Sequence, residues 1–406
     1  MAATQFLVTG MFRSGTTFCA RVLNANRHII CASDPFAPVF KAYRNTFGRA
    51  ARPDFDTASP LHDSYLDAFQ NGLFLRMQAS SFDVALDPSA LADLVEVIRV
   101  HSTAYSPIIH EHLHLMGGKD FSELFQSGLR VIEKSYPKAG HQAVGFKEVW
   151  VDEFAPHFLK LASGAKVIHV VRDPRAVVAS NYASGTHYPL LFLARQWRKL
   201  ATLAWVNAAR SNSVKIIKYE DLVTQPRETA LAICDFLGVD FDENMTRISE
   251  LKDGANQPWH QNSSYKDISS DAKAGKLPQD AKKEERWRSA LPAGHIRLVE
   301  KLCCFEMKLL GYHFVTDAAQ RPMPDEGLLF ADDAGSLADW VKPYSNYDYC
   351  TEMLAENARY ELMRSKASVG EAVEKRLALD PSAYRALVSG WAAEPAPARA
   401  SASAVV

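Results

Sequence analysis

The chain has 406 residues, of which 47% are hydrophobic and 23% are charged, and its formal net charge is −1. This composition is ordinary for a globular protein, and a chain of this length can bury a large core. The near-neutral charge excludes a general electrostatic attraction to nucleic acid or to anionic membranes, so an anion site would need a local cluster of charge.

Cysteine usage and the absence of long apolar runs bear on the compartment. Six cysteines are scattered along the chain without a CxxC pair or a closely spaced framework, which is typical of a reducing compartment. The apolar run 5–9 begins almost at the N-terminus and leaves no room for a secretory leader. No apolar run reaches the roughly 18 residues of a membrane-spanning helix. We therefore expect a cytoplasmic protein with no membrane span and no nucleic-acid partner.

The first predicted elements are a strand, a glycine-containing loop and a helix. Residues 5–9 (QFLVT) form an apolar run that ends at Gly10, and apolar residues recur at helical spacing from Thr16 onward. The loop between them, GMFRSGTT, keeps the glycine spacing of the nucleotide-binding P-loop, G-x-x-x-x-G-K-[ST], with Thr16 at the position of the lysine. Main-chain N–H groups at such a helix N-terminus still form an anion cradle.

Strands and helices then alternate along most of the chain. Helical periods fill most of 36–140, and apolar runs at 142–149, 166–171 and 213–219 are typical of buried strands. This alternation predicts an α/β fold, a parallel β-sheet flanked by helices. We expect a main domain at 1–318 with a helical insertion at about 36–140, a linker at 319–332, a helical C-terminal extension at 333–392 and a disordered tail at 393–406.

A second polar motif follows a strand in the middle of the chain. The segment VVRDPRAVVAS (170–180) places Arg172 at the carboxyl end of a strand and Ser180 two turns into the next helix. Open α/β sheets bind ligands just outside the carboxyl ends of their strands, so Arg172 and the glycine-containing loop are expected to face one crevice. A surface ion pair of Arg172 with Asp173 or Glu220 is the alternative.

The two motifs together resemble those of sulfotransferases that use 3′-phosphoadenosine 5′-phosphosulfate (PAPS). FRSGTT is followed about 155 residues later by VRDPRAVVAS and then by KYEDL, and the resemblance covers roughly 5–314. It implies the sulfotransferase variant of the P-loop NTPase-like fold, with PAPS as the sulfuryl donor and 3′-phosphoadenosine 5′-phosphate (PAP) as the product.

The resemblance also assigns binding roles to residues of the motifs. In that family the first loop holds the 5′-phosphosulfate, which here implies Arg13, Ser14, Gly15, Thr16 and Thr17. The arginine and serine of the second motif hold the 3′-phosphate, which implies Arg172 and Ser180. The tyrosine of the KYEDL segment, Tyr219, is then expected near the nucleotide.

The absent P-loop lysine fits this donor. A kinase loop neutralises a triphosphate with Mg²⁺ bridging the β- and γ-oxygens, whereas PAPS carries one phosphate bonded to a sulfuryl group. The donor demands no metal, and no apolar strand ending in an Asp placed to hold Mg²⁺ is evident. We therefore predict a metal-independent sulfotransferase. A nucleotide-binding scaffold that has lost transfer activity and a P-loop kinase are the alternatives.

Sulfuryl transfer requires a base for the acceptor and a cation for the charge that grows on the bridging oxygen. Lys147, at the end of a predicted strand, is the candidate cation, and a solvated lysine paired with Glu148 is the alternative. The tyrosyl-protein members use a glutamate a fixed distance beyond the loop, and here that position is Asp34, which is one methylene shorter. Asp34 as the N-cap of a helix that begins at Pro35 is the alternative. Glu148 and His187 are the other candidate bases.

A later polar segment, NQPWHQNSSYK (256–266), resembles the part that closes over the nucleotide in bacterial and carbohydrate-acting members. The resemblance implies a stacking ring at Trp259 and phosphate donors at Asn262, Ser263 and Ser264. A polar surface loop is the alternative. A basic cluster that either completes the anion site or marks a solvated helix face follows at Lys282, Lys283, Arg286 and Arg288.

The segment HEHLH (110–114) matches H-E-x-x-H, the helical zinc site of metalloproteases. It lies between Pro107 and Gly117, in a stretch too short for a well-formed active-site helix, and a third ligand is not evident nearby. We therefore favour a place in or beside the acceptor cleft, which 36–140 is expected to shape. The expected acceptor is a hydroxyl group of a carbohydrate or small metabolite.

Overall fold

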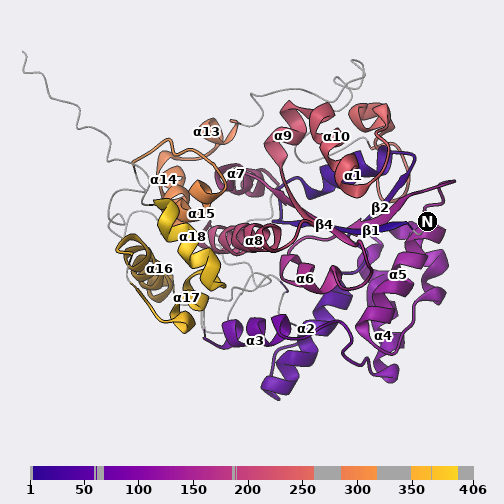
Figure 1. Ribbon diagram of the computed structural model, residues 1–406, viewed down its shortest axis with the longest axis horizontal. Helices are drawn as coiled ribbons and strands as arrows, with labels where there is room; N and C mark the ends of the chain where they lie inside the picture. Colours follow the sequence, from indigo (N-terminus) through magenta and orange to yellow (C-terminus); the bar gives the residue numbers. More distant parts are fainter. Residues whose placement is uncertain are drawn as a thin grey trace, which may run out of the picture.

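The computed structural model describes residues 3–58, 61, 68–184, 188, 190–259, 285–317, 349–366 and 368–391, and every structural statement refers to these residues. A five-stranded sheet lies at the centre (Figure 1), with all neighbouring strands parallel and in the spatial order β2-β3-β1-β4-β5. Its strands are β1 (Thr4–Gly10), β2 (Ile29–Ser33), β3 (Ala143–Lys147), β4 (Lys166–Val171) and β5 (Val214–Lys218). The predicted parallel sheet flanked by helices is confirmed.

The register of the strands brings their carboxyl ends to one edge of the sheet. Ser33 of β2 and Val8 of β1 both pair with Lys147 of β3, and Val171 of β4 pairs with Lys218 of β5. The first residues after the five strands are therefore neighbours in space, and they are Met11, Asp34, Glu148, Arg172 and Tyr219. β1 lies between β3 and β4, so the crossovers run in opposite directions from it, which is where open α/β sheets form a ligand crevice.

Both faces of the sheet are covered by helices, which explains why the strands are apolar throughout. Alternate residues of a strand point to opposite faces: Phe6 and Val8 pack in one core with α1 (Thr16–Ala25) and α10 (Pro226–Leu237). Leu7 packs in the opposite core with α2 (Ala37–Ala51) and α5 (Phe121–Ser135). In Figure 1 these helix pairs lie above and below the sheet.

Between β2 and β3 the chain is mainly helical. Besides α2 and α5 this stretch contains α3 (Ala68–Gln78), α4 (Pro88–Ser102) and the 3₁₀-helix η1 (Pro107–Leu115). Asp87 begins α4 by accepting a hydrogen bond from Ser89 N, and Asp120 begins α5 by accepting one from Glu123 N, as N-cap carboxylates do. These helices lie on one side of the sheet in Figure 1.

The C-terminal part is also helical. Its helices pack on α8 (Leu190–Arg210) in a core that includes Phe305, Tyr360 and Leu387, so the predicted helical extension is confirmed. The predicted linker and tail, at 319–332 and 393–406, lie outside the described residues.

The remaining elements are η2 (Asp152–Phe154), α6 (Ala155–Phe158), α7 (Pro174–Ser184), α9 (Tyr219–Thr224), η3 (Glu243–Thr246), η4 (Ile248–Glu250), α13 (Trp287–Ala290), α14 (Ala293–Leu302), α15 (Cys304–Leu309), α16 (Tyr349–Arg364), α17 (Glu371–Ala378) and α18 (Pro381–Trp391). Within the described ranges, none of the helices has the length and apolar character needed to cross a membrane.

A buried ion cluster fastens the C-terminal helices to α8. Glu356 of α16 accepts hydrogen bonds from Arg195 Nε at 2.5 Å and from Arg198 Nη2 at 2.9 Å. Burial alone would raise the pKa of Glu356, but Arg198 and Arg195 outweigh it and hold that pKa well below its usual range. The carboxylate is therefore charged in the folded protein.

We predict that Glu356→Ala destabilises the protein by about 3–5 kcal/mol, because it leaves the charge of two buried arginines without this carboxylate. The free energy of unfolding from urea titrations followed by circular dichroism measures the effect. Glu361→Ala, at an exposed position of the same helix, is the matched control and should change stability by less than about 0.5 kcal/mol. Equal stability of the two variants would contradict the role of the cluster.

Candidate active site

Two glycines of the loop after β1 are required by close contacts. At Gly10 (φ +150°) a Cβ would lie 2.2 Å from the carbonyl oxygen of Val170 on the neighbouring strand. At Gly15 (φ +84°), which precedes α1, a Cβ would lie 2.1 Å from Cδ2 of Tyr219. The loop therefore passes close to β4 on one side and to the Tyr219 ring on the other, which accounts for the glycine spacing seen in the sequence.

The structure brings the two sequence motifs together. Arg13 Nε donates a hydrogen bond to Ser180 Oγ at 2.9 Å, and Arg172 Nη1 donates to the carbonyl oxygen of Arg13 at 3.0 Å. The Arg172 guanidinium lies over the Tyr219 ring, 4.4 Å from its centroid. Four of the residues predicted to bind the nucleotide therefore form one cluster, although they come from the ends of three strands and from α7.

The cluster concentrates positive charge. Burial, and after it the charge of Arg172, lowers the pKa of Arg13. Arg172 is itself only 8% exposed, and its Nε has no hydrogen-bond partner within the described part of the chain. Two guanidinium groups beside a helix N-terminus are stabilised by an anion. The alternative of a surface ion pair for Arg172 is wrong, because the residue is buried.

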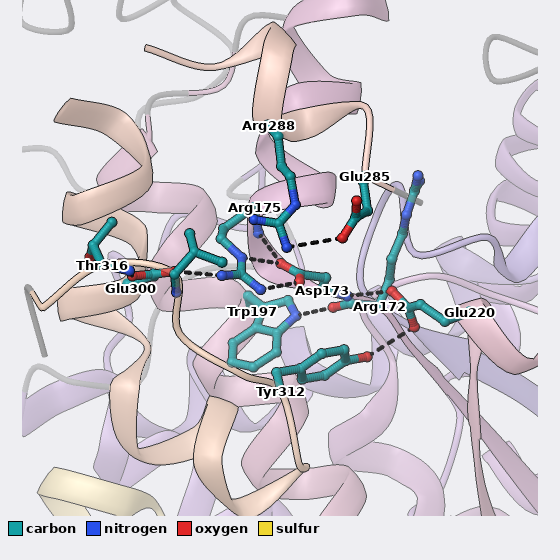
Figure 2. Close-up of polar contacts among 11 residues, drawn as sticks. Arg172, Asp173, Arg175, Trp197, Glu220, Glu285, Arg288, Glu300, Tyr312 and Thr316 are labelled. Carbon is teal, nitrogen blue, oxygen red and sulfur yellow. Dashed lines mark hydrogen bonds and ion pairs between the residues drawn. The ribbon is translucent and has the colours of Figure 1, made fainter. Parts of the chain in front are cut away.

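A polar network supports Arg172 from behind (Figure 2). Its carbonyl oxygen accepts a hydrogen bond from Trp197 Nε1 at 2.7 Å. Glu220 accepts one from the next main-chain N–H, that of Asp173, at 2.9 Å and one from the Tyr312 hydroxyl at 3.2 Å. Glu220 is therefore occupied by these two donors and does not pair with Arg172.

A second set of contacts in Figure 2 connects the segment after β4 to Glu300 of α14 and, through it, to the chain after that helix. Arg175 donates to Asp173, with Nε to Oδ1 at 2.9 Å, and also to Glu300. Glu300 in turn accepts the main-chain N–H groups of Val315 and Thr316 at 2.8 and 2.9 Å. The conformation after β4 therefore depends on residues more than a hundred positions further along the chain.

Lys147 and Asp34 form a buried ion pair at the ends of β3 and β2. Lys147 Nζ donates to Asp34 Oδ2, and the two side chains are only 2% and 11% exposed. Asp34 N donates to the carbonyl oxygen of Lys147 at 2.6 Å, and Asp34 has the left-handed φ of 47°. The alternative of a solvated Lys147 paired with Glu148 is therefore wrong. So is that of Asp34 as a helix cap, because α2 begins at Ala37.

Glu148 stabilises the start of α2 instead. Glu148 is 1% exposed, and its carboxyl group accepts the main-chain N–H of Phe36, the N-cap residue of α2. Burial, and then the negative charge of Asp34, raises the pKa of Glu148 well above its usual range. A carboxyl group with a raised pKa keeps its proton to higher pH, so Glu148 can act as a base only from its ionised form, above that raised pKa.

One cavity of about 970 Å³ joins these groups. Predicted site residues in its described lining are Arg13, Gly15, Thr16, Thr17, Asp34, Lys147 and Tyr219. Ser14 is not among them: its hydroxyl group is buried without a hydrogen-bond partner in the described structure, beside Met11 and Trp197. Arg172 and Ser180 are also outside the described lining and contact it through Arg13. The phosphate loop, Tyr219 and the Lys147–Asp34 pair thus open on a shared space.

The cavity also contains residues that the sequence did not suggest. His101 of α4 and Tyr105 both line it, and Asp34 contributes to the pKa of each. Burial lowers the pKa of His101, and Asp34 opposes this shift. No short motif surrounds His101; the only signal was its place in the helical stretch expected to shape the acceptor cleft.

Three other sets of predicted site residues either lie away from the cavity or fall outside the described structure. Trp259 packs in the apolar core, 6.1 Å from the Phe18 ring, and is not part of the described cavity lining. Arg288 pairs with Glu285 at 2.9 Å on the surface. The candidates that lie outside the described residues are His187, Asn262, Ser263, Ser264, Lys282 and Lys283.

The HEHLH segment does not form the zinc-binding helix of a metalloprotease. It lies in the 3₁₀-helix η1, which has three residues per turn, so His110 and His114 do not share a face. His110 Nε2 contacts Ser102 Oγ at 3.1 Å, and His114 Nδ1 contacts the carbonyl oxygen of Glu111 at 3.0 Å. No group of three potential metal ligands occurs among the residues with described positions. The segment is also absent from the described cavity lining.

Comparison with known proteins gives matches to both sequence and structure. The family model described as "Sulfotransferase family" matches residues 5–243. Carbohydrate sulfotransferase 1 of Rattus norvegicus is 27% identical over 183 residues (39% of this chain and 41% of that protein), and that of Homo sapiens is 27% identical over 188 residues (40% and 43%). The chain thus spans about two fifths of the length of these curated relatives. The sulfotransferase domain of the Synechococcus PCC 7002 olefin synthase matches with a TM-score of 0.41 and 19% identity, over 74% of this chain and 94% of that one.

The environment of Glu148 predicts a pH-dependent stability difference. Above pH 4.5, the ordinary pKa of a glutamate, the carboxyl group ionises in the unfolded chain but stays protonated in the folded protein. The wild type should therefore lose stability relative to Glu148→Gln by about 1.4 kcal/mol per pH unit until the folded pKa is reached. Urea titrations between pH 4 and 7 measure this difference. Parallel stability curves for the two proteins would contradict the raised pKa.

Proposed function

The chain belongs to the sulfotransferase family, and from this premise we propose that it transfers a sulfuryl group from PAPS to a hydroxyl group of a carbohydrate or small metabolite. The observation that carries the proposal is the cluster in which Arg13 contacts Ser180 and Arg172 contacts the Arg13 carbonyl. PAPS has anionic groups at both its 3′ and 5′ positions, and this cluster supplies cationic groups from two separate motifs.

The residues around the loop fit such a donor. Gly10 and Gly15 allow the backbone to approach a ligand closely, and Arg172 Nε is a buried donor without a partner in the described structure. We propose that Arg172 and Ser180 hold the 3′-phosphate and that Tyr219 lies beside the nucleotide. The proposed contacts of the 5′-phosphosulfate are Arg13, Ser14, Gly15, Thr16 and Thr17, with Ser14 acting through its main chain because its side chain does not line the cavity. The donor supplies an activated sulfuryl group and leaves as PAP, and no metal is required by this chemistry.

We propose that Asp34 and Lys147 carry the transfer itself. Asp34 takes the proton of the acceptor hydroxyl, and Lys147 neutralises the charge on the oxygen that leaves with PAP. Both side chains line the cavity beside the phosphate loop. Glu148 is the second candidate base; it also lines the cavity and would act from its ionised form, above the pKa that burial raises.

Two alternatives remain distinguishable by experiment. A scaffold that binds nucleotide without transfer would bind PAP and sulfate no acceptor. A P-loop kinase would need Mg²⁺-dependent ATP binding, against which Thr16 at the lysine position argues. We also propose a cytoplasmic location, on the cysteine usage of the sequence alone.

We predict that PAP raises the melting temperature of the protein, since a ligand at 100 times its Kd stabilises the folded state by about 2.7 kcal/mol. Arg172→Ala should remove most of this shift, because a lost hydrogen bond to a charged group is worth about 1.5–3 kcal/mol. Arg227→Ala is the matched control, since that side chain is 51% exposed and pairs with Glu243. A full shift in Arg172→Ala would contradict the site assignment.

We predict that Asp34→Asn lowers kcat by at least about a hundredfold, the usual contribution of a general base, while the affinity for PAP changes by less than about threefold. An acceptor screen with radiolabelled PAPS supplies the substrate, and initial rates supply kcat. The PAP-induced melting shift shows whether the variant is folded. If Asp34→Asn stays active and Glu148→Gln does not, Glu148 rather than Asp34 is the base.

A further inference from the structure

We infer that the acceptor is an alcohol with an apolar body, held between α2 and α4 with its hydroxyl group at Asp34, rather than a sugar. This inference rests on the proposed function and narrows its acceptor. It comes from the described lining of the cavity that contains Asp34 and Lys147.

One wall of the cavity is an apolar face of α4. Leu94, Val97 and Val100 recur every three residues, so they lie on one side of the helix, and all three line the cavity. Val97 is 53% exposed and Val100 is 69% exposed. A ligand that covers these side chains removes apolar surface from water, which favours binding in proportion to the area covered.

The opposite wall, on α2, offers few hydrogen bonds to a ligand. Ala37, Pro38 and Ala42 line the cavity there. The two polar residues of this wall are already bonded to the main chain, with Lys41 Nζ donating to the Ala58 oxygen at 2.9 Å and Asn45 Nδ2 donating to the Thr57 oxygen at 3.1 Å. The stem of Lys41 adds further apolar surface. A sugar placed here would lose the hydration of several hydroxyl groups without new partners, which is unfavourable.

Around Asp34, in contrast, the lining is polar. Lys147 donates to Asp34, and His101 lies close enough for Asp34 to affect its pKa. His101 Nε2 is buried and has no hydrogen-bond partner within the described ranges. A single hydroxyl group at this position would find an acceptor and donors, while the rest of the molecule meets aliphatic walls. The lining thus matches an amphipathic alcohol.

Matched acceptors test the inference directly. With radiolabelled PAPS at saturation, kcat/KM is measured for butan-1-ol, hexan-1-ol and octan-1-ol, and for methyl, butyl and hexyl glucoside below their micelle concentrations. We expect kcat/KM to rise by up to about fourfold for each buried methylene group, and methyl glucoside to be the poorest acceptor. Methyl glucoside equal to or better than its hexyl counterpart, or alkanols insensitive to chain length, would overturn the inference.

A substitution in the α4 wall tests acceptor binding separately from donor binding. Val97→Asp should raise KM for hexan-1-ol at least about tenfold, while KM for PAPS and the PAP-induced melting shift stay unchanged. Leu354→Asp is the matched control, since Leu354 is an apolar residue 59% exposed on α16. Equal KM values of the two variants for hexan-1-ol would overturn the inference.

The melting shift with PAP distinguishes failure of the acceptor inference from failure of the proposed function. If PAP stabilises the wild type and only unsubstituted sugars are sulfated, the acceptor inference is wrong and the proposed function stands. If PAP causes no shift and no acceptor is sulfated, the proposed function is wrong and the inference falls with it.

Discussion

The buried ion pair between Lys147 and Asp34 is the interaction on which the rest of the site depends. Removing two charges from water is costly, and the pair repays that cost only where its geometry is fixed. The parallel register fixes it, since Ser33 and Lys147 are partners and Asp34 is the next residue along the chain. Glu148 lies in the same buried place, and its burial, followed by the negative charge of Asp34, raises its pKa. Lys147 donates its hydrogen bond to Asp34, while Glu148 accepts the main-chain N–H of Phe36.

Backbone strain is concentrated at the same edge of the sheet. Arg13, Asp34 and Trp150 have left-handed φ angles without being glycine, and all three line the cavity. Such conformations cost about 1–3 kcal/mol each and persist where the surroundings enforce them. The three residues follow the neighbouring strands β1, β2 and β3, whose buried apolar faces supply the compensating stability. The chain therefore turns sharply at the point where three strands deliver polar groups into one space.

The sequence predicted those parts of the molecule that depend on local pattern. Apolar runs predicted four of the five strands but not β2, and the ends of parallel strands must meet, so Arg13 and Arg172 could be expected to face one crevice. The place of Tyr219 beside them was implied by the family resemblance. Features that depend on packing between distant segments could not be predicted. The N–H of Phe36 is satisfied by Glu148, which lies 112 positions away, so no local pattern could exclude Asp34 as the cap. His101 reaches the site only through the docking of α4 against α2.

The proposed donor side and the proposed acceptor side of the cavity are built from different kinds of structure. The donor side is built from strand ends and a glycine loop, which Gly10 and Gly15 hold within van der Waals contact of β4 and Tyr219. Almost any added atom would disturb it. The acceptor side is built from the partly exposed face of α4, where Val97 and Val100 have room to change. Substitutions there alter a wall of the cavity without touching the arginine cluster, and effects at sites without shared partners are additive. Under the proposed function, the fold would therefore permit the acceptor to change while the donor stays the same.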